Sequence, residues 1–96
     1  MAVEGSMAQA IVDPEHLQRF AANLRLFSAD LREQSRHLQR QFQQLGESWR
    51  DQEQQRFAEE FQLMLSSLER FAHVADEQVP LLQRKAAAIQ QYLRGR

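Results

Sequence analysis

The chain has 96 residues, which is enough for one small domain that buries only about two-thirds of the surface of its unfolded chain. It has no cysteine, three glycines and two prolines, which excludes disulfides and thiolate metal sites and leaves too few turn residues for a sheet fold. Its net charge of −1 argues against a nucleic-acid-binding protein, and no apolar run approaches the roughly 20 residues that cross a membrane. The composition therefore predicts an all-α protein without nucleic acid or membrane contact.

The N-terminal residues differ in composition from the rest of the chain. Residues 1–6 (MAVEGS) resemble a remnant of cloning in front of a native start at Met7, and residues 7–13 form a short, mildly apolar arm. This region lacks a basic segment followed by an apolar one, so we expect no signal peptide and a chain made in the cytoplasm. Residues 14–96 then form a single helical-hairpin domain.

A first helix is predicted over residues 14–45. Asp13 can cap the free backbone N–H groups, and Pro14 suits the first helical position. No glycine or proline follows until Gly46, which is the natural left-handed cap at the C-terminal end of such a helix.

The turn and the second helix follow directly. Residues 46–50 are predicted to form the turn, and residues 51–93 the second helix. Asp51 fits the start of that helix, with a possible capping-box pair to Gln54. Because a short turn makes neighbouring helices antiparallel, facing residues should have numbers that add up to about 96.

Apolar residues recur along both helices at steps of three and four residues, which is the pattern of packed helices and not of a strand. In the second helix this pattern continues to Leu93, with two successive steps of four at Val79, beside Pro80. An extra four-residue step unwinds a supercoil, and a proline removes one backbone N–H, so we expect a kink near Pro80; the alternative is a break into a third helix. The expected core seam comprises Leu17, Leu24, Leu31, Leu38, Leu45, Phe57, Phe61, Met64, Leu68 and Phe71.

The hairpin alone leaves apolar residues without a partner. In the predicted register the first helix ends opposite about Leu82, and the second continues beyond it. Leaving a large apolar side chain in water forfeits about 1.5–3 kcal/mol. We therefore expect a partner, most simply a second copy that completes a four-helix bundle, the alternative being a monomer with scattered surface leucines. The apolar residues off the seam are Leu26, Leu63, Leu65, Val74 and Leu81.

The turn (LGESWRD, residues 45–51) and the following FAEEF (residues 57–61) resemble the WXG family. These are small helical-hairpin proteins similar to the early secreted antigens and exported by bacterial type VII secretion systems. The resemblance covers residues 8–93. It implies a hairpin that pairs with itself or with a homologous hairpin, with the secretion machinery as a further partner.

The turn departs from the family's Trp-x-Gly signature, because Trp49 and Arg50 are followed by Asp51. Aspartate caps a helix better than glycine, so a tight turn is still expected. We expect Trp49 to cover the open end of the bundle; the alternative is a recognition anchor for another protein.

The C-terminal tail also departs from the family. Its export signal, a tyrosine followed four residues later by an acidic residue, reads Tyr92 and Arg96 here, so the resemblance carries over the fold and self-association but not type VII export. Residues 78–96 have a net charge of +4 and residues 51–77 one of −5. This asymmetry indicates either charge pairing between the helices or a basic docking tail. The residues of that candidate tail are Tyr92, Leu93, Arg94 and Arg96.

No combination of side chains indicates a catalytic, cofactor or metal site. Glu69, His73 and Glu77 share one helix face, but di-metal helix bundles use Glu-x-x-His, so we interpret these residues as a solvated stripe. We predict a non-enzymatic interaction protein resembling secreted effectors or adaptors. The alternative is a purely structural dimerisation module or accessory subunit of a larger complex that is not secreted.

Overall fold

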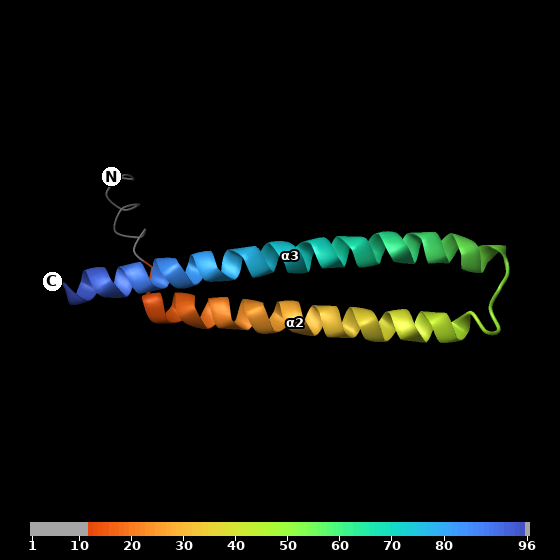
Figure 1. Cartoon of the computed structure of the whole chain (residues 1–96), viewed down its shortest axis with the longest axis horizontal. Coiled ribbons are helices and arrows are strands. Elements are labelled where there is room, and N and C mark those ends of the chain that lie inside the picture. The colour runs from red at the N-terminus through yellow and green to blue at the C-terminus, as the bar shows by residue number, and fades with distance from the viewer. Residues whose placement is uncertain (1–11, 96) are drawn as a thin grey trace.

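The structure, a computed structural model, describes residues 12–95 and consists of two long antiparallel helices joined by a short turn (Figure 1). Helix α2 spans Pro14–Leu45 and helix α3 spans Gln52–Arg94. The predicted all-α hairpin is confirmed. The expected cloning remnant, most of the N-terminal arm and Arg96 lie outside the described residues.

Aspartate caps begin both helices. Asp13 Oδ1 accepts a hydrogen bond from the backbone N–H of Glu15 at 2.9 Å, and Asp51 Oδ1 accepts one from the N–H of Gln54 at 2.9 Å. Each carboxylate satisfies a donor that the first turn of a helix leaves unpaired. The two helix starts therefore follow directly from local sequence.

The end of α2 differs from the prediction. Gly46 has φ −63° and ψ −13°, which is right-handed helical geometry, so the predicted left-handed cap is wrong. Its N–H donates to the carbonyls of Phe42 and Gln43, and the N–H of Trp49 donates to Leu45 O at 2.8 Å. Arg50 Nε donates to Gly46 O at 3.0 Å. Backbone hydrogen bonds of the turn and the Arg50 side chain thus satisfy carbonyls at the C-terminal end of α2. A residue in the left-handed conformation is therefore not needed there.

The register of the two helices is also shifted from the prediction. Phe71 contacts Phe27, whereas the predicted register placed it beside Leu24. The shift is about one helical turn, since Ser28 meets Ala72 and facing residue numbers there add up to 100 and not to about 96.

The shifted register also shortens the overhang of α3. Ala86 is completely buried, and Gln18 Nε2 donates to Gln90 Oε1 at 3.4 Å, so α2 covers α3 beyond the predicted limit at Leu82. Figure 1 shows the remaining C-terminal end of α3 projecting past the start of α2.

The seam between the helices is built largely from small residues. Ser28 on α2 and Ala72 on α3 are completely buried against each other. From Ala58 to Ile89, buried and half-buried positions on α3 alternate in steps of three and four, so the predicted double step of four at Val79 is wrong. These positions are Ala58, Phe61, Leu65, Leu68, Ala72, Ala75, Val79, Leu82, Ala86 and Ile89.

Five of the ten residues predicted for the core seam lie on the flank of the observed seam and not within it. Phe61 is buried, and Leu17, Leu24, Leu31 and Leu68 are half-buried, as expected for seam residues. The prediction assigned the largest apolar side chains to the seam. In the structure, small residues fill the seam and let the two backbones approach, so the larger side chains lie on its flank. The remaining five are between 41% and 51% exposed in the single chain: Leu38, Leu45, Phe57, Met64 and Phe71.

Helix α3 continues through Pro80 without a break. The alternative of a third helix is therefore wrong for residues 12–95. Pro80 itself is exposed, while its neighbour Val79 is buried in the seam. Water can thus bind the backbone carbonyl that lacks a donor because proline has no N–H. The packing of the seam continues on both sides of Pro80.

Candidate interaction surfaces

Large apolar side chains gather on one side of the hairpin. On α2, Phe20 and Phe27 are seven residues apart. On α3, the same spacing separates Phe57 from Met64 and Met64 from Phe71. All five side chains are 41–58% exposed. A seven-residue spacing keeps side chains on one side of a packed helix. The rings of Phe27 and Phe71 meet edge to face with centroids 5.9 Å apart, which joins the two rows. We call these five residues the apolar face.

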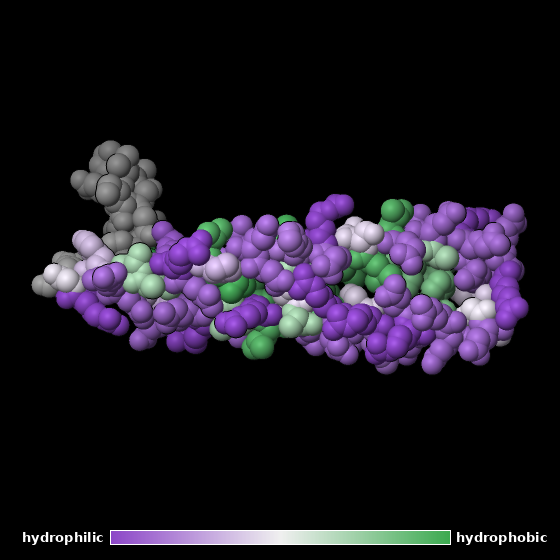
Figure 2. All heavy atoms as spheres, viewed as in Figure 1, coloured by the Kyte–Doolittle hydropathy of each residue, from purple (hydrophilic) through white to green (hydrophobic). Residues whose placement is uncertain are grey.

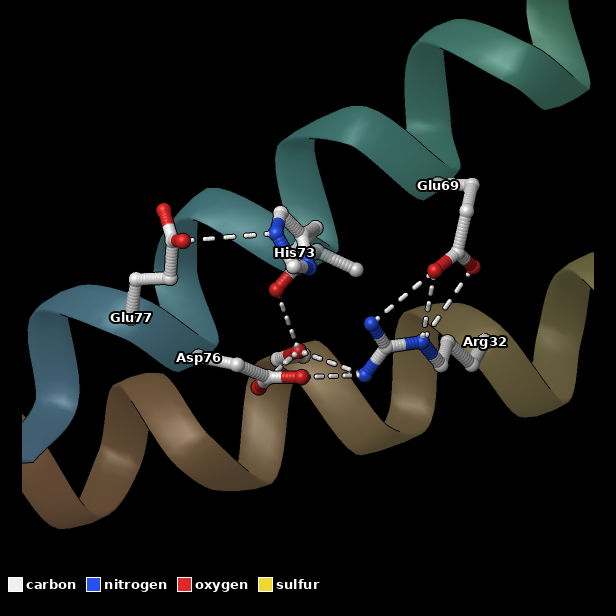
Figure 3. Close-up of polar contacts among 7 residues, drawn as sticks. Arg32, Glu69, His73, Asp76 and Glu77 are labelled. Carbon is white, nitrogen blue, oxygen red and sulfur yellow. Dashed lines mark hydrogen bonds and ion pairs between the residues drawn. The ribbon is translucent and has the colours of Figure 1, made fainter.

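The opposite side of the hairpin is closed by a polar network. Arg32 on α2 lies between two carboxylates of α3: its Nη2 donates to Glu69 Oε2 at 3.0 Å, and its Nη1 donates to Asp76 (Figure 3). The buried Ser28 hydroxyl lies 2.8 Å from Asp76 Oδ1 and 3.2 Å from the carbonyl oxygen of Ala72, and can donate to either. These contacts tie the middle of α2 to the middle of α3.

The protonation of this network follows from its hydrogen bonds. Hydrogen bonds to Glu69 and Asp76 raise the pKa of Arg32 above its ordinary value. The hydrogen bond from Arg32 lowers the pKa of Glu69. Hydrogen bonds from Arg32 and Ser28 lower the pKa of Asp76. All three groups are therefore held in their charged forms near neutral pH, and one guanidinium pairs with two carboxylates within the hairpin.

The polar side carries a shallow groove between the two helices. A groove of about 250 Å³ lies between the helices, lined by Arg32, Arg36 and Glu69 among other residues, and it is open to solvent. The face drawn in Figure 2 is largely hydrophilic, with hydrophobic residues visible in patches toward the turn and near the middle of the molecule. A shallow groove of this kind lacks the burial that small-molecule sites provide.

The carboxylate and imidazole side chains on α3 diverge. His73 Nε2 lies 3.4 Å from Glu77 Oε2, while Glu69 points away from this pair toward Arg32 (Figure 3). Across residues 12–95 no three such side chains come together in an arrangement that could hold a metal ion. Glu69, His73 and Glu77 are all exposed, and Glu69 pairs with Arg32 across the hairpin.

An aromatic cluster occupies the turn end of the hairpin. The Trp49 ring centroid lies 6.1 Å from that of Phe57, and Trp49 is half-buried. Phe42 contacts Phe57 and Phe61, with centroids 5.5 and 5.1 Å apart. Trp49 thus covers part of this cluster at the end of the seam, while Asp51 caps α3 beside it.

A sequence model of a family described as proteins of 100 residues with WXG matches residues 9–92. The chain belongs to the WXG100 family. Comparison with curated proteins and with solved structures finds no match. Members of this family are small helical proteins associated with secretion and are not enzymes.

The WXG100 motif ends here in Asp51, whose side chain caps α3. At the other end of the molecule, Tyr92 and Leu93 are 60% and 43% exposed and lie on the last turns of α3, and Arg94 is its last residue. The candidate tail is therefore helical as far as Arg94, and the turn motif and the tail lie at opposite ends of α3. No helix within residues 12–95 is long and apolar enough to cross a membrane.

Sequence reasoning missed the most connected polar residue of this WXG100 protein. Neither Arg32 nor Ser28 is among the site residues predicted from the sequence. The available signal was the seven-residue spacing of Ala21, Ser28 and Ser35, which marks a row of small residues facing the other helix.

Proposed function

We propose that this WXG100 protein is a non-enzymatic interaction protein whose apolar face is covered by another helical hairpin, so that four helices form one bundle. The observation that carries the proposal is the edge contact between Phe27 and Phe71, because it joins exposed aromatic rows of both helices into one continuous surface. Large exposed apolar patches of this kind are typical of protein–protein interfaces.

The opposite side supports the same assignment. Arg32, Glu69 and Asp76 satisfy one another within the hairpin, so that side gains little from a partner. The apolar face instead keeps half-exposed phenylalanines in contact with water, and covering them gives a hydrophobic driving force for association.

Within a bundle, the two ends of α3 remain available for further contacts. We propose that the turn around Trp49 and the tail around Leu93 serve as the contact sites of a secreted effector or adaptor, with a type VII apparatus as the export route. Family membership supports that route. The rival is a purely structural dimerisation module or accessory subunit that is not exported. An export assay on the untagged protein, in cells with and without a type VII apparatus, separates the two.

The interaction itself is tested by the mass of the untagged protein in solution, from light scattering across a dilution series. We expect a complex of hairpins for the wild type and loss of that complex for Phe27→Glu. Leu26→Glu is the matched control, because Leu26 is the neighbouring residue and is 67% exposed but does not belong to the apolar face. Unchanged association in Phe27→Glu, with helicity retained, contradicts the proposal.

A further inference from the structure

Met64 lies at the centre of the α3 row of the apolar face. Phe57 precedes it by seven residues and Phe71 follows it by seven, so all three lie on the same side of the helix. Met64 is 49% exposed in the single chain, and it is the only methionine within residues 12–95. The apolar face thus holds a single sulfur atom, in a side chain that solvent reaches.

Solvent reaches Met64 from the outer surface of α3. An open hollow of about 320 Å³ lies there and is lined by Leu63, Met64 and Ser67 among other residues, all of them on α3. Because α2 contributes none of this lining, the packing of the hairpin leaves the hollow uncovered. A small oxidant such as hydrogen peroxide can therefore approach the thioether of Met64 in the free hairpin.

Oxidation changes the polarity of a methionine side chain more than its size. Hydrogen peroxide transfers one oxygen atom to the lone pair of Sδ: an S–O bond forms, the O–O bond breaks, and water leaves. The resulting sulfoxide carries an oxygen that accepts hydrogen bonds, so an apolar side chain becomes polar. No thiol competes for the oxidant, because the chain has no cysteine.

We propose that Met64 is an oxidation site through which peroxide controls whether the apolar face is covered. The inference rests on the proposed function and names a regulation of the same surface. As a thioether, Met64 continues the apolar surface between Phe57 and Phe71, and covering it is favourable. As a sulfoxide, it places an acceptor at the centre of the face, and covering that acceptor with apolar side chains removes it from water without a donor.

Oxidation and association therefore oppose each other. A partner over the apolar face shields Met64 from peroxide, and an oxidised Met64 disfavours the partner. The free hairpin is the form that reacts, and the reaction keeps it free by mass action. Because a methionine sulfoxide can be reduced enzymatically, the change is reversible.

The effect on association is tested by light scattering of the untagged protein across a dilution series, before and after hydrogen peroxide. Mass spectrometry of the peptide that contains Met64 confirms the added oxygen, and circular dichroism confirms that helicity is retained. We expect the concentration at half-association to rise about tenfold to a hundredfold, the range that follows from burying an acceptor without a donor.

Two variants of Met64 isolate its sulfur. Met64→Leu keeps the apolar surface, lacks the sulfur and retains Met1 and Met7, so its association should be the same before and after peroxide. Met64→Gln has a similar length and ends in a polar amide. It should associate as weakly as the oxidised wild type without any peroxide.

The shielding of Met64 is tested by the rate at which it is oxidised. In the wild type this rate should fall as the protein concentration rises and hairpins associate. In Phe27→Glu, which is expected not to associate, the rate should be high at every concentration. A rate in the wild type that is independent of concentration while association rises overturns the inference.

The outcomes separate this inference from the proposed function. Complete oxidation of Met64 with unchanged association, or a loss of association that also occurs in Met64→Leu, overturns the inference and leaves the proposed function standing. An untreated protein that associates neither with itself nor with another hairpin overturns the proposed function, and the inference with it.

Discussion

Phe27 and Phe71 meet edge to face across the two helices, with ring centroids 5.9 Å apart and ring planes at 87°. One residue further along each helix, the hydroxyl of Ser28 lies 3.2 Å from the carbonyl oxygen of Ala72, inside the seam. On the far side of that seam, Arg32 binds Glu69 and Asp76. A cross-section through the middle of the molecule thus passes from an apolar face, through a seam of small residues, to a network of paired charges.

Phe61 is the large side chain that the hairpin buries most completely. It is 7% exposed and packs against Phe42 and Phe57. Phe61→Ala should therefore lower the free energy of unfolding by about 3–5 kcal/mol, measured by chemical denaturation. Leu63→Ala, at an exposed position on the same helix, should change it by less than about 0.5 kcal/mol. A loss below about 1 kcal/mol for Phe61→Ala would place Phe61 outside the core.

Ser28 tests the close packing of the two backbones. It is completely buried where the helices meet, opposite the completely buried Ala72. Ser28→Leu should destabilise the hairpin by about 1–3 kcal/mol, because a larger side chain forces the helices apart. Ala29→Leu adds the same bulk at the neighbouring exposed position and should be nearly neutral. Equal stability of the two variants, by thermal unfolding, contradicts a closely packed seam at Ser28.

The helix bounds were predictable from sequence, whereas the seam and register were not. Asp13, Pro14 and Asp51 act locally, so their effect on helix starts needs no knowledge of the fold. The seam depends on how closely two helices approach. Small residues such as Ser28 and Ala72 decide that distance, yet a search for large apolar side chains passes over them.

The polar network was not predictable for the same reason. Ser28 and Asp76 are 48 residues apart, and their contact appears only when the register is known. The predicted register, in which facing residue numbers add up to about 96, was displaced by about one helical turn, since Ser28 faces Ala72. Without the correct register, the sequence does not identify Glu69 and Asp76 as the partners of Arg32.

The network predicts a specific pH dependence. The pKa values of Glu69 and Asp76 are lowered in the folded hairpin, mainly by hydrogen bonds from Arg32. Their contribution to stability is therefore complete above the pKa of the unfolded carboxyls, about 4, and is lost as the pH falls through the lower folded values. Arg32 has a raised pKa, so its own contribution is lost only in strong alkali.

Arg32→Gln tests this dependence. Its Tm should lie below that of the wild type at pH 7, and the difference should narrow as the pH falls below about 4, because the carboxylates that Arg32 binds become protonated. Arg25→Gln, one heptad earlier on α2, removes the same charge and should leave the wild-type profile unchanged. A difference in Tm that stays constant with pH contradicts the role assigned to the network.

Trp49 distinguishes a structural cover from a recognition anchor. Its ring lies 6.1 Å from that of Phe57, and the side chain is half-buried. If Trp49 is a cover, Trp49→Ala should lower the free energy of unfolding by about 1–3 kcal/mol, which is less than for a fully buried tryptophan. Trp49→Phe should then lower it by a smaller amount. As an anchor only, Trp49→Ala should unfold like the wild type. Trp49→Ala and the wild type, compared in one denaturation series, decide between the two.

Asp51 stands where the WXG100 signature has glycine, and its carboxylate accepts the N–H of Gln54 at 2.9 Å. Asp51→Ala removes this cap and should cost about 1 kcal/mol, whereas Asp51→Gly, which recreates the signature, should cost only a few tenths of that amount because glycine is itself tolerated at the cap. Asp51→Asn keeps an acceptor oxygen and should unfold like the wild type. If Asp51→Ala and Asp51→Gly lose the same stability in urea, the turn depends on the aspartate for something other than capping α3.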